Sequence, residues 1–170
     1  ATTSNHLAPN VSARARGSAS PTRKVERVSM PFVLIEKPRP HVALVTLNRP
    51  ERMNSMAFDV MIPLRDALEE VSLDNDTRVV VLTGAGHGFC SGADLEDSGT
   101  IPNIAGLTRS SIAQRSMELL HDVIVGLRRM PQPVIAAVNG AAIGCGFSLA
   151  VVADIRLAAD GAYFRSAGIN

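Results

Sequence analysis

The sequence predicts an α/β domain, and three observations support this fold class. Short runs rich in Val, Ile and Leu, which suit β-strands, alternate with longer segments whose apolar residues recur at helical spacing. Residues 79–82 and 134–138 are apolar without interruption, as in strands buried on both faces. With 46% hydrophobic residues among 170, the chain is long enough to bury a sizeable core.

Charge is distributed unevenly along the chain. Residues 1–29 carry five basic residues and one acidic residue, which leaves 12 basic and 15 acidic residues for the rest. A nucleic-acid-binding module usually carries its positive charge on the folded body. Because the body here is mildly acidic, we expect no nucleic-acid partner.

Residues 1–29 are expected to be a disordered basic extension, and residues 30–170 the folded domain. The extension has almost no large apolar side chains, so it cannot offset the entropy lost on ordering. Its Arg- and Ser-rich composition faintly resembles an organellar transit peptide, but we favour a disordered extension or sequence ahead of a start at Met30. It lacks the apolar run of a secretory signal, and Cys90 and Cys145 form no disulfide framework, so we expect a reducing, cytoplasmic location.

The domain is expected to begin with a β-hairpin. Residues 32–37 and 42–47 are rich in strand-forming side chains, and a Pro-containing turn at 38–41 separates them. Pro50 ends the second strand, since the residue before a proline avoids the helical region.

A helix is expected next, capped by Asn54 or Ser55 and running to about Val71. Pro63 lies inside this segment, so we expect a kink or a later start. A Gly-rich loop at 84–97 follows the buried strand at 78–83.

A long helix is then expected at 111–130, ended by Pro131. Its predicted apolar face consists of Ile112, Met117, Leu120, Val123, Ile124 and Leu127. Beyond it we expect a strand at 134–138, a turn, a short helix at 147–153, and strands at 155–158 and 162–164.

The stretch between Arg129 and Asp154 contains no charged residue and is long enough to raise the question of a membrane span. Pro131, Pro133 and the pair Asn139-Gly140 interrupt it, and its periodicity changes from strand to helix. We therefore interpret it as a buried strand, turn and helix, and expect no membrane partner.

Two Gly-rich segments follow buried strands and could carry chemistry. They are GFCSGADL at residues 88–95 and NGAAIGCG at residues 139–146, which opens a helix. Glycine allows close backbone approach, and a helix N-terminus presents free N–H groups. Two N–H groups from separate segments are what an oxyanion hole requires, although such loops are as often simple tight turns.

Three longer motifs support a specific resemblance. LNRPERMNSM (47–56), VVVLTGAGHGFCSGADL (79–95) and PVIAAVNGAAIGCGFSLAVVADIRLAADGAYF (133–164) are together similar to the enoyl-CoA hydratase/isomerase, or crotonase, family. The resemblance implies a spiral of ββα units of the Clp/crotonase type, incomplete here because the family's domain normally continues beyond Asn170. It also implies an acyl-CoA thioester substrate of fatty-acid metabolism, coenzyme A only as part of that substrate with no permanently bound cofactor, and homotrimers or hexamers.

The same resemblance suggests which residues form the site. Ala93 and Cys145 would supply the backbone N–H groups of the oxyanion hole. Ser91, Ala93 and Leu95 would line the adenine pocket through their backbone, and Arg52 would meet a CoA phosphate. For Arg52 a solvated loop arginine is an equal alternative, and for Cys145 we favour a small apolar filler over a nucleophile.

The two glutamates that hydratases of the family use for acid–base chemistry have no counterpart here. Their positions correspond to Ser148 and Gly168, and neither side chain can act as a general base near neutral pH. Two hypotheses therefore stay open: a CoA-thioester enzyme with a non-standard acid or base, and a non-catalytic acyl-CoA-binding remnant or decayed truncated paralogue. We expect Asp94 and Asp154 to be structural, and Glu96 and Asp97 to be solvated loop charges.

Other chemistries fit less well. A Clp-type protease would need a G-x-S-x-G elbow, which Ser148 lacks, and His121 is expected on a helix surface. Residues 84–88 lack the third glycine of a dinucleotide fingerprint. The four histidines have no metal-ligand spacing, so no metal site is expected, and His87 is interpreted as a surface loop residue.

Overall fold

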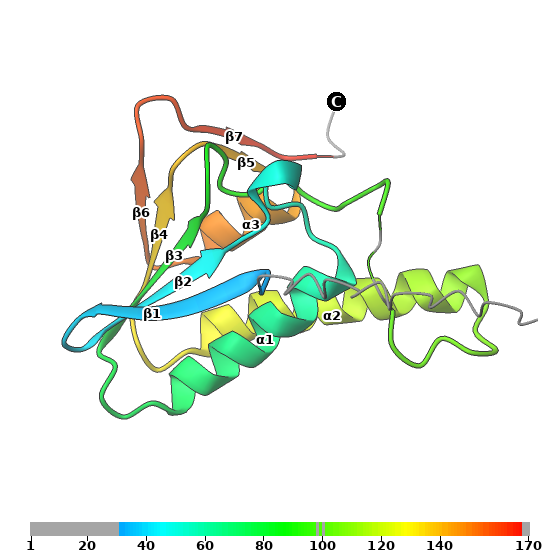
Figure 1. Cartoon of the computed structure of the whole chain (residues 1–170), viewed down its shortest axis with the longest axis horizontal. Helices are drawn as coiled ribbons and strands as arrows, with labels where there is room; N and C mark the ends of the chain where they lie inside the picture. Colours follow the sequence, from blue (N-terminus) through cyan, green and yellow to red (C-terminus); the bar gives the residue numbers. More distant parts are fainter. Residues whose placement is uncertain (1–30, 98, 100, 168–170) are drawn as a thin grey trace, which may run out of the picture.

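A five-stranded sheet forms the centre of the computed structural model, which describes residues 31–97, 99 and 101–167 (Figure 1). The strand order is β1-β2-β3-β4-β6. The bounds are β1 Val33–Arg39, β2 Val42–Leu47, β3 Val79–Gly84, β4 Val134–Val138 and β6 Ile155–Ala158. The extension predicted at 1–29 lies outside the described residues.

The hairpin prediction is confirmed. Strands β1 and β2 pair antiparallel, with Val33 opposite Leu47, and the other neighbours in the sheet are parallel. Strand β1 continues two residues further than predicted, through Pro38 to Arg39. Proline is tolerated there because β1 is an edge strand, where an N–H need not be paired.

Two helices lie side by side beneath the sheet in Figure 1, α1 (Phe58–Leu73) and α2 (Arg109–Arg129). Helix α1 starts later than its predicted caps, at Phe58 after Ala57, but Pro63 still lies inside it. Asn54 is occupied elsewhere: its side chain accepts from the Arg49 N–H at 2.8 Å and donates to the Gly88 carbonyl at 2.9 Å.

Helix α2 begins two residues earlier than predicted because Thr108 caps it, accepting a hydrogen bond from the Ser111 N–H at 3.2 Å. Leu119, Val123 and Leu127 are buried at a spacing of four. The expectation for Met117 is wrong, since this residue is 64% exposed and lies off the buried stripe. The stripe is narrower than predicted because α2 packs mainly on one neighbour, α1.

A second, two-stranded parallel sheet pairs β5 (Ala141–Ile143) with β7 (Tyr163–Arg165). Strand β5 was not predicted, because three residues of Ala and Ile within a Gly-rich run carry no strand signal. Helix α3 (Cys145–Val152) follows directly and starts two residues before the predicted short helix. The long uncharged stretch is thus strand, strand and helix, and within the described residues no helix is long and apolar enough to cross a membrane.

The core lies between the sheet and helices α1 and α2. Its largest fully buried side chains include Leu47, Leu64, Leu82 and Phe89. At the other end, the edge strand β6 is exposed along its whole length, and Leu157 is 60% exposed. The β6 edge therefore presents apolar side chains outward.

Candidate functional site

The two Gly-rich segments lie directly against each other. The Cys90 N–H donates to the Ala141 carbonyl at 2.9 Å, and the Ile143 N–H donates to the Cys90 carbonyl at 2.9 Å. These bonds form a short parallel bridge between Cys90 and β5. The loop after β3 is therefore fastened along the segment that leads into α3.

Each candidate N–H donor follows a glycine in a left-handed conformation. Gly92 has φ of +102° and Gly144 has φ of +55°, values that L side chains rarely adopt. The two glycines are also neighbours in space, since a Cβ built on Gly144 would lie 3.7 Å from the Gly92 Cα. Ala93 and Cys145, the next residues on each segment, are consequently brought to the same place.

The hydrogen bonds around Ala93 determine where its N–H points. The Gly92 carbonyl accepts from the Met56 N–H at 2.7 Å, and the Asp94 N–H donates to the Met56 carbonyl at 2.9 Å. Because C=O and N–H point to opposite sides of one trans peptide, the Ala93 N–H points away from Met56. No described backbone carbonyl accepts a hydrogen bond from it.

Cys145 is the first residue of α3, where backbone N–H groups have no partner within the helix. The first intrahelical bond runs from the Ser148 N–H to the Gly144 carbonyl at 3.0 Å. The positive end of the helix dipole adds to the donor strength at this point. Two amide donors on adjacent segments can thus polarise a carbonyl group placed between them.

The Cys145 side chain is a buried thiol rather than an exposed nucleophile, with 8% of the residue exposed. Interaction with the neighbouring, fully buried Cys90 thiol lowers the pKa of Cys145, helped by the backbone N–H groups of Gly146 and Cys145 and opposed by burial. The same contact, together with burial, raises the pKa of Cys90 well above its usual value.

Ser148 and Gly168 are the positions where hydratases of the resembled family carry glutamates. The Ser148 side chain is exposed, and its hydroxyl donates to the Gly144 carbonyl at 3.3 Å, one helical turn back. Gly168 lies outside the described residues. The Ser148 hydroxyl therefore supports the start of α3 and offers no basic group.

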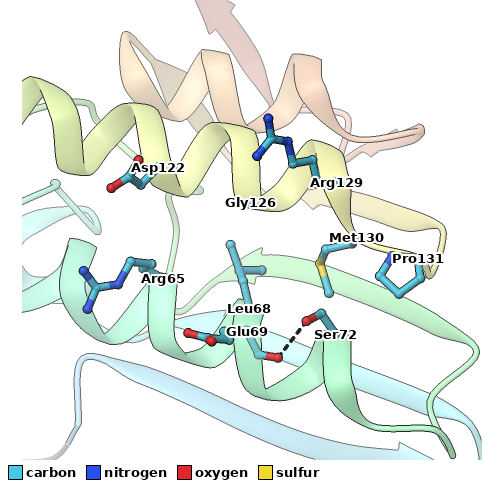
Figure 2. Close-up of a pocket in the computed structure, with 9 residues that line it drawn as sticks. All are labelled: Arg65, Leu68, Glu69, Ser72, Asp122, Gly126, Arg129, Met130 and Pro131. Carbon is cyan, nitrogen blue, oxygen red and sulfur yellow. Dashed lines mark hydrogen bonds between the residues drawn. The ribbon is translucent and has the colours of Figure 1, made fainter.

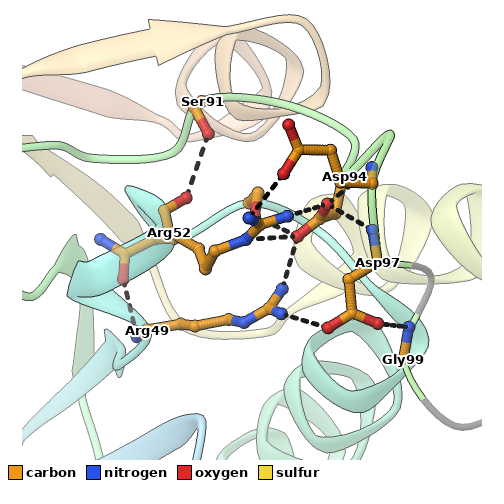
Figure 3. A network of polar contacts seen from close by, with 9 residues as sticks. Arg49, Arg52, Ser91, Asp94, Asp97 and Gly99 are labelled. Atoms are coloured by element: carbon orange, nitrogen blue, oxygen red, sulfur yellow. Dashed lines mark hydrogen bonds and ion pairs between the residues drawn. The ribbon is translucent and has the colours of Figure 1, made fainter.

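A buried carboxylate holds the segment that carries Ala93 (Figure 3). Asp94, with its side chain 2% exposed, pairs with Arg49 at 2.8 Å and with Arg52 at 2.7 Å. The Ser55 hydroxyl donates to the same carboxylate at 2.9 Å. The hydrogen bonds from Arg52 in particular hold the pKa of Asp94 well below its usual range, so this group is ionised and structural, as expected.

Glu96 and Asp97 are exposed as expected, yet both are paired. Glu96 accepts from Arg52 at 2.8 Å and Asp97 accepts from Arg49 at 2.9 Å. Both remain solvated loop charges, and the two arginines reach them from the segment that precedes α1. Arg52 is also not a free loop arginine: it is fixed between Asp94 and Glu96.

The residues predicted to contact a CoA nucleotide line one open pocket of about 380 Å³. Arg52, Ser91, Ala93 and Leu95 all belong to its wall. The Ser91 hydroxyl donates to the Arg52 carbonyl at 3.4 Å, and Leu95 is 94% exposed. Sequence reasoning missed the contributions of Glu51, Met53 and Ser55, which only the fold brings to this wall.

Comparison with known proteins agrees with this geometry. The sequence profile described as enoyl-CoA hydratase/isomerase matches residues 38–170. The chain belongs to the enoyl-CoA hydratase/isomerase family.

Curated relatives within the family are similar over most of this chain. A probable enoyl-CoA hydratase of Mycobacterium bovis is 65% identical over 144 residues, covering 85% of this chain and 50% of the relative. The 1,2-epoxyphenylacetyl-CoA isomerase of Escherichia coli is 40% identical over 143 residues, covering 79% of this chain and 50% of the relative. This chain therefore spans about half the length of the curated relatives it matches.

Solved structures of the enoyl-CoA hydratase/isomerase family share the fold. A probable enoyl-CoA hydratase/isomerase from Mycobacterium abscessus has a TM-score of 0.72 and 62% identity, covering 78% of this chain and 48% of that one. A monofunctional enoyl CoA isomerase from M. smegmatis has a TM-score of 0.66 and 55% identity, covering 82% of this chain and 55% of that one. The crotonase-like α/β architecture expected from the motifs is confirmed.

A second pocket in this family member, of about 260 Å³, adjoins the other side of Ala93. Ala93 and Asp94 line both pockets. The second is bounded mainly by apolar side chains of α1 and α2 and of the segments that precede them, including Met56, Phe58, Met61, Ile101 and Ile112. The helical spacing predicted a core role for several of these residues but gave no sign of a cavity.

A groove of about 290 Å³ lies between α1 and α2 (Figure 2). It is lined by residues such as Arg65, Leu68 and Arg129, and none of the predicted site residues reaches it. His87 and His121 are exposed as predicted. Among the described residues, no group of three or more His, Cys, Asp or Glu is arranged to hold a metal ion.

Proposed function

We propose that this chain binds an acyl-CoA thioester and stabilises the enolate that forms when a proton leaves the carbon next to the thioester carbonyl. The observation that supports this most is the pair of amide groups at Ala93 and Cys145, one on each of two touching Gly-rich segments. Negative charge grows on the carbonyl oxygen as the proton leaves, so donors aimed at that oxygen favour the transition state over the ground state.

The two pockets on either side of Ala93 support an assignment of the two ends of the substrate. The open pocket, with Arg52, Ser91 and Leu95 in its wall, suits the nucleotide end of CoA. The apolar pocket next to α1 and α2 suits the acyl chain, which gains from leaving water. CoA then belongs to the substrate, and the proposal includes no permanently bound cofactor.

Within the reactions of the family, we favour double-bond isomerisation over hydration. Hydration needs side chains that hold and activate water, and Ser148 provides a hydroxyl that already donates within α3. Isomerisation needs the enolate to be stabilised while a base removes one proton and an acid returns another, and a residue other than Ser148 would have to serve as that base and acid. The M. smegmatis protein of known structure, 55% identical, is named a monofunctional enoyl CoA isomerase.

A non-catalytic acyl-CoA-binding protein is the second candidate. It is favoured by the absence of a carboxylate at residue 148, which leaves no evident base at this position. The proposal also includes a role in fatty-acid metabolism in the cytoplasm, assembly into trimers or hexamers, and a division of the chain into an extension at residues 1–29 and a domain at 30–170.

The test compares Ala93→Pro with Ala93→Gly in assays of 3-enoyl-CoA isomerisation and crotonyl-CoA hydration. Proline removes the backbone N–H, whereas glycine keeps it. We expect isomerase activity in the unmodified chain, a loss of about 10²–10³-fold in kcat for Ala93→Pro, and a much smaller loss for Ala93→Gly.

Equal activities of the two folded variants would show that the Ala93 donor plays no part. Saturable binding of CoA esters without turnover in either assay would support the non-catalytic candidate. Hydration faster than isomerisation would overturn the preference stated above.

A further inference from the structure

The open pocket has an unfavourable charge for the ligand assigned to it. Among its lining residues, Arg52 is the only cation, and it shares the wall with three carboxylates, those of Glu51, Asp94 and Glu96. The nucleotide end of CoA carries several phosphate charges, which these carboxylates repel. Some rearrangement of charge must therefore accompany the binding of a phosphate here.

The three hydrogen-bonding nitrogens of Arg52 are divided between two very different carboxylates. Nε and Nη2 donate to Asp94 at 3.2 and 2.7 Å, and Nη1 donates to Glu96 at 2.8 Å. The Asp94 side chain is 2% exposed, whereas that of Glu96 is 81% exposed. One side of the guanidinium is anchored in the protein, and the other is paired at the surface of the pocket.

The two pairs differ in how easily they separate. Asp94 also binds Arg49, Ser55 and the backbone N–H groups of Glu96 and Asp97, the last two at 3.1 and 2.9 Å. Breaking that set would leave a buried charge without partners. The Glu96 pair is solvated and contributes little to stability, so its carboxylate can leave Nη1 at little cost.

We propose that Glu96 is an internal competitor for ligand phosphate: its carboxylate occupies Arg52 Nη1 in the ligand-free chain and is displaced when a phosphate group binds. Asp94 keeps the guanidinium in place during the exchange, so Nη1 stays directed at the same point. This inference rests on the proposed function only for the identity of the ligand as CoA. The exchange itself requires an anionic phosphate of any origin.

The exchange has a consequence for selectivity. A phosphate that carries more charge than a carboxylate gains more from Arg52 than Glu96 loses, whereas a singly charged ligand gains little. The cost of displacing Glu96 is the same for every anion that binds Nη1, so only a ligand that gains more than this cost from Arg52 binds there. This deepens the proposed function by making residue 96 a determinant of which ligands enter.

Glu51 provides a matched control for Glu96. Both are glutamates in the wall of the same pocket, but within the described residues Glu51 forms no ion pair with Arg52. Glu51→Gln therefore removes the same charge without freeing Nη1. Any effect of Glu96→Gln beyond that of Glu51→Gln reports on competition rather than on general repulsion.

The experiment measures the Kd of CoA, and separately of inorganic pyrophosphate, by calorimetry on the full chain at low salt. The chains compared are the unmodified one, Glu96→Gln, Glu51→Gln, Arg52→Gln and the double variant Arg52→Gln with Glu96→Gln. We expect Glu96→Gln to tighten binding about two- to fivefold more than Glu51→Gln, the range that an exposed ion pair supports. In the Arg52→Gln background this advantage disappears.

A second measurement avoids dependence on the folding of the Arg52 variants. Because the Arg52–Glu96 pair is exposed, high salt screens it, and the advantage of Glu96→Gln over Glu51→Gln should shrink toward onefold between about 0.05 and 0.5 M salt. If the ratio of the two Kd values does not change over this range, the proposal that Glu96 competes with phosphate is overturned.

The outcomes separate this inference from the proposed function. Equal tightening of CoA binding by the Glu96 and Glu51 variants overturns the inference and leaves the proposed function standing. If Glu96→Gln binds pyrophosphate more tightly than Glu51→Gln but no chain binds CoA, the inference is supported and the proposed function is overturned. If no chain binds either probe, both are overturned.

Discussion

The two segments that meet at the candidate site are held in place by different forces. Residues 91–97 are held by ion pairs between the buried carboxylate of Asp94 and the arginines around it. Residues 139–146 are held by close backbone packing, which two glycines in this segment permit. One segment should therefore respond to pH and charge, and the other to added volume.

The contact on the second segment is very close. A Cβ on Gly140 would lie 2.0 Å from the His87 carbonyl oxygen, and one on Gly146 would lie 2.3 Å from the Cys90 carbonyl oxygen. The atoms met are backbone, which cannot rotate aside as a flexible side chain can. In contrast, nothing but charge and hydrogen bonds holds the Asp94 carboxylate to Arg52, a half-buried side chain.

The largest expected effect comes from Asp94→Asn, which removes the charge with almost no change of shape. The variant leaves Arg49, with its side chain 8% exposed, with only the exposed carboxylate of Asp97 as a counter-charge. We expect the free energy of unfolding at pH 7 to fall by about 3 kcal/mol, as for other broken buried ion pairs. Urea denaturation followed by circular dichroism measures this change.

Asp74→Asn is the control, because the Lys37–Asp74 pair has similar geometry, at 2.6 Å, but its lysine is half exposed. A loss as large as that of Asp94→Asn would show that burial does not distinguish the two pairs. The expected loss is much smaller, since solvent screens the exposed pair.

Asp94→Asn also tests how the stability of the chain depends on pH. The folded-state pKa of Asp94 is lowered, first by its hydrogen bonds from Arg52. Its contribution is thus fully present above the unfolded-state pKa of about 4 and is lost as pH falls further. Between pH 5 and 2 the unmodified chain should lose more stability than Asp94→Asn, and parallel losses would contradict the assignment.

The next largest effect is expected from Gly140→Ala, on the segment held by close backbone packing. The added methyl group would overlap the His87 carbonyl, so the turn between β4 and β5 must shift, at a cost of about 1–3 kcal/mol. Unlike the effect of Asp94→Asn, this loss should not vary between pH 5 and 2. Thermal unfolding measured between pH 5 and 2 gives both the loss of stability and its dependence on pH.

Gly126→Ala is the matched control for added volume. Gly126 lies in α2, and a Cβ there meets nothing within 4 Å. Alanine is favoured over glycine in a helix by about 0.5–1 kcal/mol, so this variant should be stabilised. A loss of stability in both glycine variants would mean that local contact does not explain the effect.

The features that the sequence could predict are those set by residues close together in the chain. The buried strand at 134–138 and the strand at 42–47 were predicted with their observed bounds, because their apolar runs are stopped by proline or Asn-Gly. The structural role of Asp94 followed from its place in a recognised motif. These features depend on local pattern.

What the sequence could not predict depends on partners far along the chain. Strand β5 exists because β7 and the loop at Cys90 both pair with it, and Asn54 caps no helix because it binds the carbonyls of Ala85 and Gly88. Likewise, the pairing of Arg52 with Glu96 joins residues 44 positions apart. The predicted roles of Ala93, Cys145, Ser148 and Gly168 remain predictions.

The smallest expected effect concerns the thiol contact that joins the two segments. Cys145 has a lowered pKa and slight exposure, whereas Cys90 is fully buried with a raised pKa. Because the thiolate is the reactive form, iodoacetamide at pH 7.5 should modify Cys145 first, with Cys90 slower by a factor on the order of ten or more. Peptide mass spectrometry over time measures both rates.

Removing the partner thiol sharpens this last comparison. In Cys90→Ala, Cys145 loses the interaction with the Cys90 thiol that is the main cause of its lowered pKa, so its alkylation at pH 7.5 should slow. If Cys145 instead reacts faster, its rate is set by access between the two segments rather than by its thiolate fraction. That result would mean that the contact between Cys90 and Cys145 shields the site without tuning it.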